Sequence, residues 1–146
     1  MAQKLHPIQL QGIRVAELYL KILDPNEAQK DDLNLPFTFS TGHSSFDQDS
    51  NQISVGVFGQ IGTDDEDAKS SPFVMKVNVF GQFLVDVTEF PVDQINKWAS
   101  ENAPLILLPF LREHIYGLAS RAGIREVIVP LYVVPTYTVQ RPVSNN

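Results

Sequence analysis

The feature of this sequence that most restricts its fold is a long run in which every second residue is apolar. Between residues 73 and 87 the odd-numbered positions are apolar, with glycine at position 81: Phe73, Met75, Val77, Val79, Phe83, Val85 and Val87. Because successive side chains of a strand point to opposite faces, this spacing predicts one long strand that buries a single face. Alternation of this kind is typical of an antiparallel sheet with one side covered.

Three further stretches have the same period. Two of them predict short strands: Leu33, Leu35, Phe37 and Phe39 in one, and Ile53, Val55, Val57 and Ile61 in the other. Pro36 cannot donate a ladder hydrogen bond, so its strand belongs at an edge or contains a bulge. Residues 8–23 alternate too, but their apolar positions change from even to odd and back. We therefore expect a bulge or bend near Gly12, and four strands joined as a meander or a Greek key.

The period changes to a helical one after Glu89. Residues 92–99 have helical spacing behind Pro91, a residue that suits a first helical turn. A longer helix is expected from Pro104 to Gly123, which can adopt the left-handed conformation that ends helices. Pro109 lies inside it and lacks a backbone N–H, so we expect a kink or a break there. One side of this helix is apolar: Leu107, Leu111, Ile115, Leu118 and Ala122.

Strands followed by helices indicate a single α+β domain over residues 1–146. The expected architecture is a four-stranded antiparallel sheet followed by a short and a long helix. From Glu126 onward we expect an extended tail, with residues 140–146 flexible. Some apolar residues of the long helix lie outside its apolar side, so we expect another subunit to bury part of it: Leu105, Leu108 and Phe110.

The sequence offers no pattern of side chains that would support catalysis or metal binding. It contains no cysteine, which excludes thiolate nucleophiles and cysteine-type zinc sites. Residues 47–51 begin like a calcium-binding loop, but Gln52 and Phe58 stand where glycine and glutamate are required. The three histidines are too far apart for a helical zinc motif: His6, His43 and His114. We expect no enzyme, metal or cofactor.

Charge and hydropathy restrict the partners and the location of the protein. Its net charge of −6 repels phosphate backbones, so we expect no nucleic-acid binding. The densest apolar run, residues 105–111, is far shorter than the roughly 20 residues that span a bilayer. Residues 1–11 lack the apolar centre of a secretory signal, so we expect a cytoplasmic protein without membrane contact.

Large apolar groups are numerous for a small domain whose sheet is covered by few helices. Besides residues 105–111 they are Phe37, Phe39, Phe46, Phe58, Phe80, Phe83, Tyr132 and Tyr137. Two interpretations are open. These side chains form a core together with an oligomer interface, or they line an open binding groove.

A set of residues in the long helix is characteristic and includes the segment P-F-L-R-E. Its members are Pro104, Ile106, Leu107, Pro109, Phe110, Arg112, Glu113, Ile115, Leu118, Ser120 and Arg121. This set resembles the helix signature of the SecB export-chaperone family, and the order of strands and helices agrees over residues 8–131. The resemblance implies a homotetramer, a dimer of dimers packed through the long helix. It also implies a holdase that binds unfolded polypeptides in hydrophobic grooves without ATP.

The resemblance also assigns roles to individual residues. It implies a groove for client polypeptides lined by the strand with Leu33, Leu35, Phe37 and Phe39, by the start of the helical region and by the extended segment that follows it. From the aromatic groups named above we add Phe46, Phe58, Tyr132 and Tyr137 to the expected groove. Subunit contacts are expected at Leu107, Leu108, Phe110, Leu111, Ile115 and Leu118. The alternative function is a non-catalytic oligomeric scaffold or a small-ligand-binding domain, in which these residues form only core and interface.

The chain departs from the export members of that family in three ways. Residues 141–146 lack the acidic tail that docks on the translocase motor SecA, and residues 134–137 are poor material for the family's final helix. Glu17 aligns with an acidic motor-contact position, but Lys21 and Lys76 occupy two others. Such charge reversal weakens a contact with SecA that depends on electrostatic complementarity. These departures favour a divergent SecB-like chaperone of a toxin–antitoxin–chaperone system, with an antitoxin as client, over preprotein export.

Overall fold

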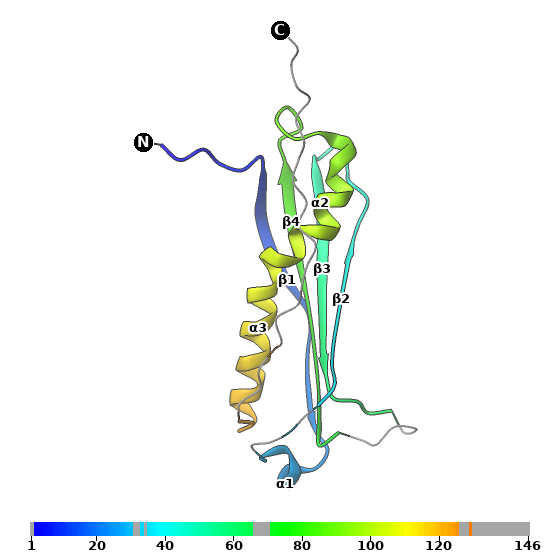
Figure 1. The fold of residues 1–146 in the computed structure, drawn as a ribbon, viewed down its shortest axis with the longest axis vertical. Helices are drawn as coiled ribbons and strands as arrows, with labels where there is room; N and C mark the ends of the chain where they lie inside the picture. The colour runs from blue at the N-terminus through cyan, green and yellow to red at the C-terminus, as the bar shows by residue number, and fades with distance from the viewer. Residues whose placement is uncertain (1, 31–32, 34, 66–70, 126–128, 130–146) are drawn as a thin grey trace.

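The computed structural model arranges the chain as strands first and helices second (Figure 1). It describes residues 2–30, 33, 35–65, 71–125 and 129. The strands are β1 (Ile8–Ile22), β2 (Phe37–His43), β3 (Gln52–Ile61) and β4 (Phe73–Val85). A single helical turn, α1 (Pro25–Ala28), follows β1, and β4 leads through the 3-10 turn η1 (Val92–Gln94) into α2 (Ile95–Glu101) and α3 (Ala103–Arg121).

The four strands form one antiparallel sheet in the order β1-β4-β3-β2, which confirms the predicted fold class. β2 lies at an edge, as Pro36 requires. It begins at Phe37, later than the alternation from Leu33 predicted. Pro36 explains the late start, because it contributes only a carbonyl, which accepts a hydrogen bond from the Gly62 N–H at 3.0 Å.

β1 contains two bulges. Its register against β4 shifts between Leu10 and Gly12 and again between Val15 and Glu17. The first shift is the bulge expected near Gly12, whereas the second was not predicted. Each extra residue reverses which positions face the core, so an even-odd-even pattern needs two bulges.

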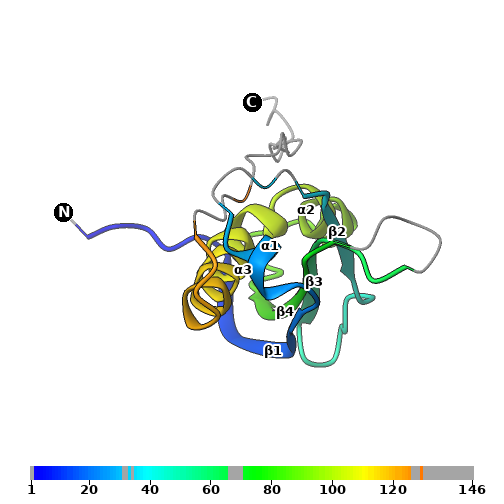
Figure 2. The same ribbon diagram turned by 90° about the horizontal axis from the view of Figure 1, so that it is seen from below.

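Both α2 and α3 pack against the same face of the sheet (Figure 2). The core lies between these two layers and is apolar. Among its most deeply buried side chains are Val55, Val57, Val77 and Phe83 from the sheet and Ile95, Leu107, Leu111 and Ile115 from the helices. We call this side of the sheet the covered face, and the other side the open face.

The long helix ends as expected but does not break. Of the predicted kink or break at Pro109, the break does not occur, because α3 continues through this residue as one bent helix. At its end Gly123 adopts a φ of 69°. Its N–H donates to the Ser120 carbonyl, and the Ile124 N–H donates to the Ala119 carbonyl. This pair of bonds is a Schellman cap, in which two carbonyls of the last turn gain donors.

Candidate functional site

A row of half-buried apolar side chains runs along β2 and its neighbours on the covered face. Five side chains there are half-buried and pack against the core, and we call them the β2 strip: Leu33, Leu35, Phe37, Phe39 and Phe46. Half-burial of several large apolar groups at one edge leaves contact area that a further polypeptide segment can use.

Strand register explains why Phe37 and Phe39 face the helices. They stand opposite Ile61 and Gly59 of β3, and directly opposed residues of antiparallel strands share a face. Helix α2 also contacts β2 and β3. It is fixed there by Trp98, which is buried and meets the Phe83 ring edge-on at 5.1 Å.

Phe58 is separate from the β2 strip, contrary to its expected place in the same groove. It stands opposite Ser40 on the open face, where its ring meets that of Phe80 edge-on at 5.5 Å. The sequence contained the signal, because Phe58 occupies an even position in a strand whose buried residues, such as Val55 and Val57, are odd. Tyr132 and Tyr137 lie outside the described residues.

The expected subunit contacts on α3 also need correction. Four of those residues are buried within the protomer and offer no surface to a second subunit: Leu107, Leu108, Leu111 and Ile115. Phe110 and Leu118 are half-buried against the same core. The apolar side chains of α3 that remain accessible are Leu105, Ile106 and Tyr116, with 40–43% exposure. We call these three residues the outer stripe of α3.

Glu17, the expected motor-contact position, lies on the open face in β1. Its carboxylate accepts a hydrogen bond from the Asn78 side-chain amide at 3.3 Å. Lys76 is close by in register, with its ammonium group 5.2 Å from the centre of the Tyr19 ring. The carboxylate therefore sits on a face that also carries cations.

The described residues hold no cluster of three or more metal-ligating side chains. Of the histidines, His6 bonds the Ile8 N–H at 3.0 Å, and His43 contacts the Ser44 carbonyl at 2.7 Å. These contacts are local and structural. Among the helices described, none is long and apolar enough to span a bilayer.

Comparison with known proteins identifies the architecture. No protein-family profile and no curated protein matches the sequence. Among solved structures, a SecB-like chaperone from Mycobacterium tuberculosis, in complex with a ChAD peptide from the antitoxin HigA1, superposes with a TM-score of 0.68. The match covers 89% of this chain and 94% of the other, at 13% identity. The fold is that of a SecB-like chaperone.

The SecB-like fold confirms the resemblance carried by the residues of the long helix. A second solved structure, a protein of unknown function from Streptococcus agalactiae, has a TM-score of 0.47 at 12% identity and covers 86% of this chain and 97% of its own. That likeness is too weak to add to the argument. The 13% identity of the first match explains why the fold is recognised more clearly from the structure than from the whole sequence.

Proposed function

We propose that this chain is an ATP-independent holdase that binds unfolded or aggregation-prone polypeptides along the β2 strip. The observation that carries the proposal is the half-buried row of large apolar side chains on the covered face of a SecB-like fold. Fully burying one such side chain is worth roughly 1.5–3 kcal/mol, and the interaction has no directional requirement. A row of them therefore favours non-native chains over folded ones, and neither catalysis nor a cofactor is needed.

An antitoxin is the client that we favour over secreted preproteins. The structurally similar M. tuberculosis chaperone was solved with a peptide from an antitoxin. The departures from export members point the same way, since Lys21 and Lys76 replace acidic positions beside Glu17. We expect toxin and antitoxin genes next to the gene for this chain, and we expect co-expression to keep that antitoxin soluble in the cytoplasm.

We also propose that the working form is a homotetramer, a dimer of dimers. The outer stripe of α3 supports this proposal, because three apolar side chains of one helix are left to solvent in the protomer. Val15 and Leu18 of β1 are similarly exposed, at 41% and 45%, on the covered face. A second copy packed against α3 would remove this surface from water.

The test is suppression of aggregation. A heat-unfolded reporter protein is mixed with the chaperone without nucleotide, and light scattering is followed. We expect strong suppression by the wild type and a several-fold loss with Phe39→Ser, because this substitution removes the largest apolar group at the centre of the β2 strip.

Phe58→Ser is the matched control, because it makes the same chemical change on the neighbouring strand but on the open face. It should suppress aggregation as well as the wild type does. An oligomeric scaffold predicts no suppression by any of these proteins. Equal losses for Phe39→Ser and Phe58→Ser, with both variants folded by circular dichroism, would show that the β2 strip is not the client site.

A further inference from the structure

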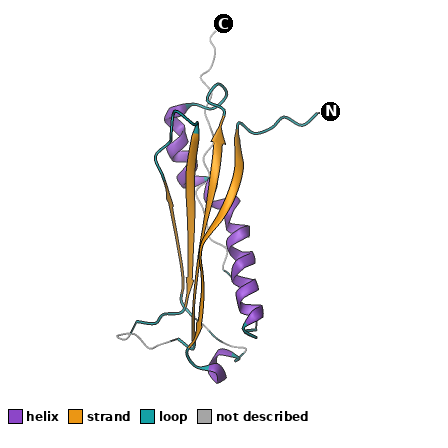
Figure 3. Ribbon diagram, turned by 180° about the vertical axis from the view of Figure 1, so that it is seen from behind, coloured by secondary structure: helices purple, strands orange, loops and turns teal. Residues whose placement is uncertain are grey.

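The open face of the sheet is not covered by any of the described helices (Figure 3). Register defines its members: β1 contributes Arg14, Glu17 and Lys21, β4 contributes Lys76, Asn78, Phe80 and Gln82, and β3 contributes Gln52, Ser54 and Phe58. The β2 strip lies on the opposite side. A ligand of the open face and a client of the β2 strip would therefore not compete for the same side chains.

The open face is cationic although the whole chain is acidic. Arg14, Lys21 and Lys76 oppose one carboxylate, Glu17, on a chain whose net charge is −6. Within the described part of the chain Arg14 makes no salt bridge, and Lys76 reaches Asp64 only at 4.0 Å. Arg14 is therefore the cation best placed to attract an incoming anion, whereas Lys76 already faces Asp64 and the Tyr19 ring.

Arg14 borders an apolar centre, and the other two cations lie further along the sheet, at Lys76 of β4 and at Lys21 opposite Val74. Phe80 stands directly opposite Arg14 in the β1–β4 register, and its ring meets that of Phe58 at an interplanar angle of 76°. Aromatic side chains beside an arginine are the composition of binding hot spots. Cation and ring here belong to adjacent strands of a rigid sheet, so little ordering is needed on binding.

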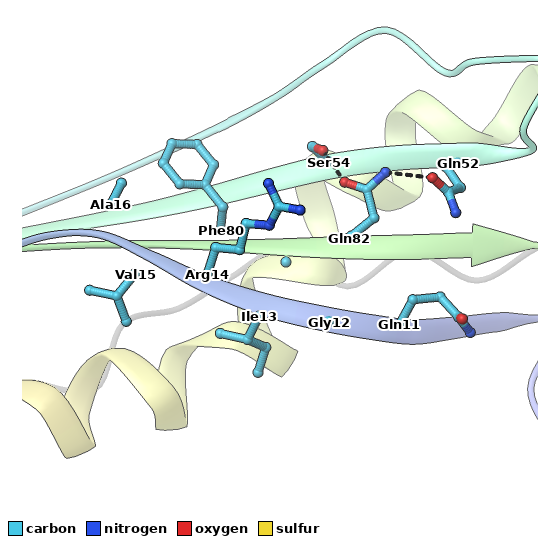
Figure 4. Close-up of a pocket in the computed structure, with 11 residues that line it drawn as sticks. Gln11, Gly12, Ile13, Arg14, Val15, Ala16, Gln52, Ser54, Phe80 and Gln82 are labelled. Atoms are coloured by element: carbon cyan, nitrogen blue, oxygen red, sulfur yellow. Dashed lines mark hydrogen bonds between the residues drawn. The ribbon is translucent and has the colours of Figure 1, made fainter.

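A hollow of about 750 Å³ adjoins this centre, between the two bulges of β1 and the strands β4 and β3 (Figure 4). Part of its polar floor is paired internally. Gln82 donates to Gln52 at 2.9 Å and accepts from the Ser54 hydroxyl. With these amides paired to one another, the guanidinium of Arg14 is the strongest donor left at the rim.

We propose that the open face docks an acidic segment of a partner protein that inserts an apolar side chain beside Phe58 and Phe80. Carboxylates of the segment would pair with Arg14, Lys21 and Lys76, while the apolar side chain would enter the hollow. A nucleic acid fits less well, because three cations neutralise few phosphates and the chain as a whole repels the rest. The docking site is independent of the proposed holdase function.

The test uses a fluorescein-labelled acidic peptide in which a central Leu-Phe pair is flanked on both sides by runs of Asp and Glu. Anisotropy is measured with the full-length protein. We expect saturable binding that weakens as salt is added. Two control peptides should bind at least several-fold more weakly. One has Ser in place of the Leu-Phe pair and lacks the apolar contact, and the other has Lys in place of the acids and lacks the charge complementarity.

Two pairs of variants locate the site. Arg14→Glu should reduce the affinity about tenfold or more, whereas Arg121→Glu, the same charge change at the end of α3, should not change it. Phe58→Ser should weaken the peptide but spare suppression of aggregation, and Phe39→Ser should do the reverse. Because each variant should affect only one of the two measurements, the pair distinguishes an error in the proposed docking site from an error in the proposed holdase function.

Several outcomes would overturn the proposal. They are absence of binding by the acidic peptide, equal losses for Arg14→Glu and Arg121→Glu, and displacement of the peptide by an unfolded client. Tighter binding of a single-stranded DNA oligonucleotide that Arg14→Glu abolishes would assign the face to nucleic acid instead. Circular dichroism spectra equal to that of the wild type ensure that each variant is folded.

Discussion

Two aspartates make turns whose stability depends on their negative charge. Asp47 accepts hydrogen bonds from the Ser50 hydroxyl at 2.7 Å and the Asp49 N–H at 3.0 Å. Asp86 accepts from the Thr88 hydroxyl at 2.6 Å and the Thr88 N–H at 3.0 Å. In both cases the side-chain bond, followed by the backbone bond, lowers the pKa of the carboxyl from its ordinary value of 3.8. The charged form is the one that the folded turns prefer.

This preference predicts how stability changes in acid. A pKa that is lower in the folded state contributes stability above the unfolded pKa, and that contribution is lost as the pH falls through the folded pKa. The melting temperature should therefore drop more steeply below pH 3.8 in the wild type than in the double variant Asp47→Asn, Asp86→Asn. Asp93→Asn, an exposed change in η1, is the control. Identical acid profiles for the wild type and the double variant would contradict the assigned hydrogen bonds.

Single positions also show what sequence reasoning could and could not predict. The place of Phe39 on the covered face followed from its odd position in β2, and the same parity rule, applied to Phe58, would have put that residue on the open face. The sequence could not predict that Leu105 and Tyr116 are both exposed. An α-helix that is apolar around most of its circumference does not show which of its sides packs against the sheet. Leu108 lies off the predicted apolar side and is nevertheless buried.

At the level of elements, close packing of α3 on the sheet depends on Gly81. A Cβ atom added there would lie 2.6 Å from the Leu107 Cδ2 and 3.2 Å from the Leu10 Cδ1. Leu107 is fully buried. Gly81→Ala should lower the free energy of unfolding by roughly 1–3 kcal/mol, the usual cost of overpacking a core.

Gly12→Ala is the matched control, because a Cβ there meets nothing within 4 Å. It should be neutral or slightly stabilising, since alanine loses less backbone entropy on folding. Urea denaturation of both variants measures the difference. A Gly81→Ala variant as stable as Gly12→Ala would mean that α3 does not pack on β4 as closely as described.

Elements with a strong period were predictable, and short or chemically special ones were not. β3 and β4 follow directly from alternation, and the end of α3 follows from Gly123. α1 has only one turn, which is too short to show a helical period in the sequence. It is stabilised by Asp24, whose side chain accepts hydrogen bonds from the Asn26 and Glu27 N–H groups. The start of β2 was also missed, because alternation from Leu33 does not show that Pro36 contributes only a carbonyl, which accepts from the Gly62 N–H.

For the whole molecule, we propose three separate binding surfaces, each with a different partner. The β2 strip takes clients, the open face takes an acidic partner, and the outer stripe of α3 takes a second copy. The sheet separates the first two, so each can be changed without altering the other. This separation depends on packing both helices on one face, which leaves the other face available. Sequence alone suggested a groove and an oligomer, but it assigned Phe58 to the same groove as Phe39, although the two residues lie on opposite faces of the sheet.

Assembly can be tested on the outer stripe of α3. Leu105 is 40% exposed in the protomer, so Leu105→Glu should leave the fold intact. In the proposed tetramer the same change puts a carboxylate into apolar surface that loses its water, at a cost of several kcal/mol unless it is paired. Light scattering coupled to size exclusion should therefore give about four times 16.3 kDa for the wild type and a smaller mass for the variant.

Leu84→Glu is the matched control for this substitution, since Leu84 is 38% exposed but lies on the open face. It should keep the wild-type mass. A wild type that elutes at 16.3 kDa at every concentration would contradict the assembly, as would an equal loss of mass in both variants. Because the β2 strip is present in each protomer, a monomeric Leu105→Glu variant that still suppresses aggregation would show that client binding does not require the tetramer.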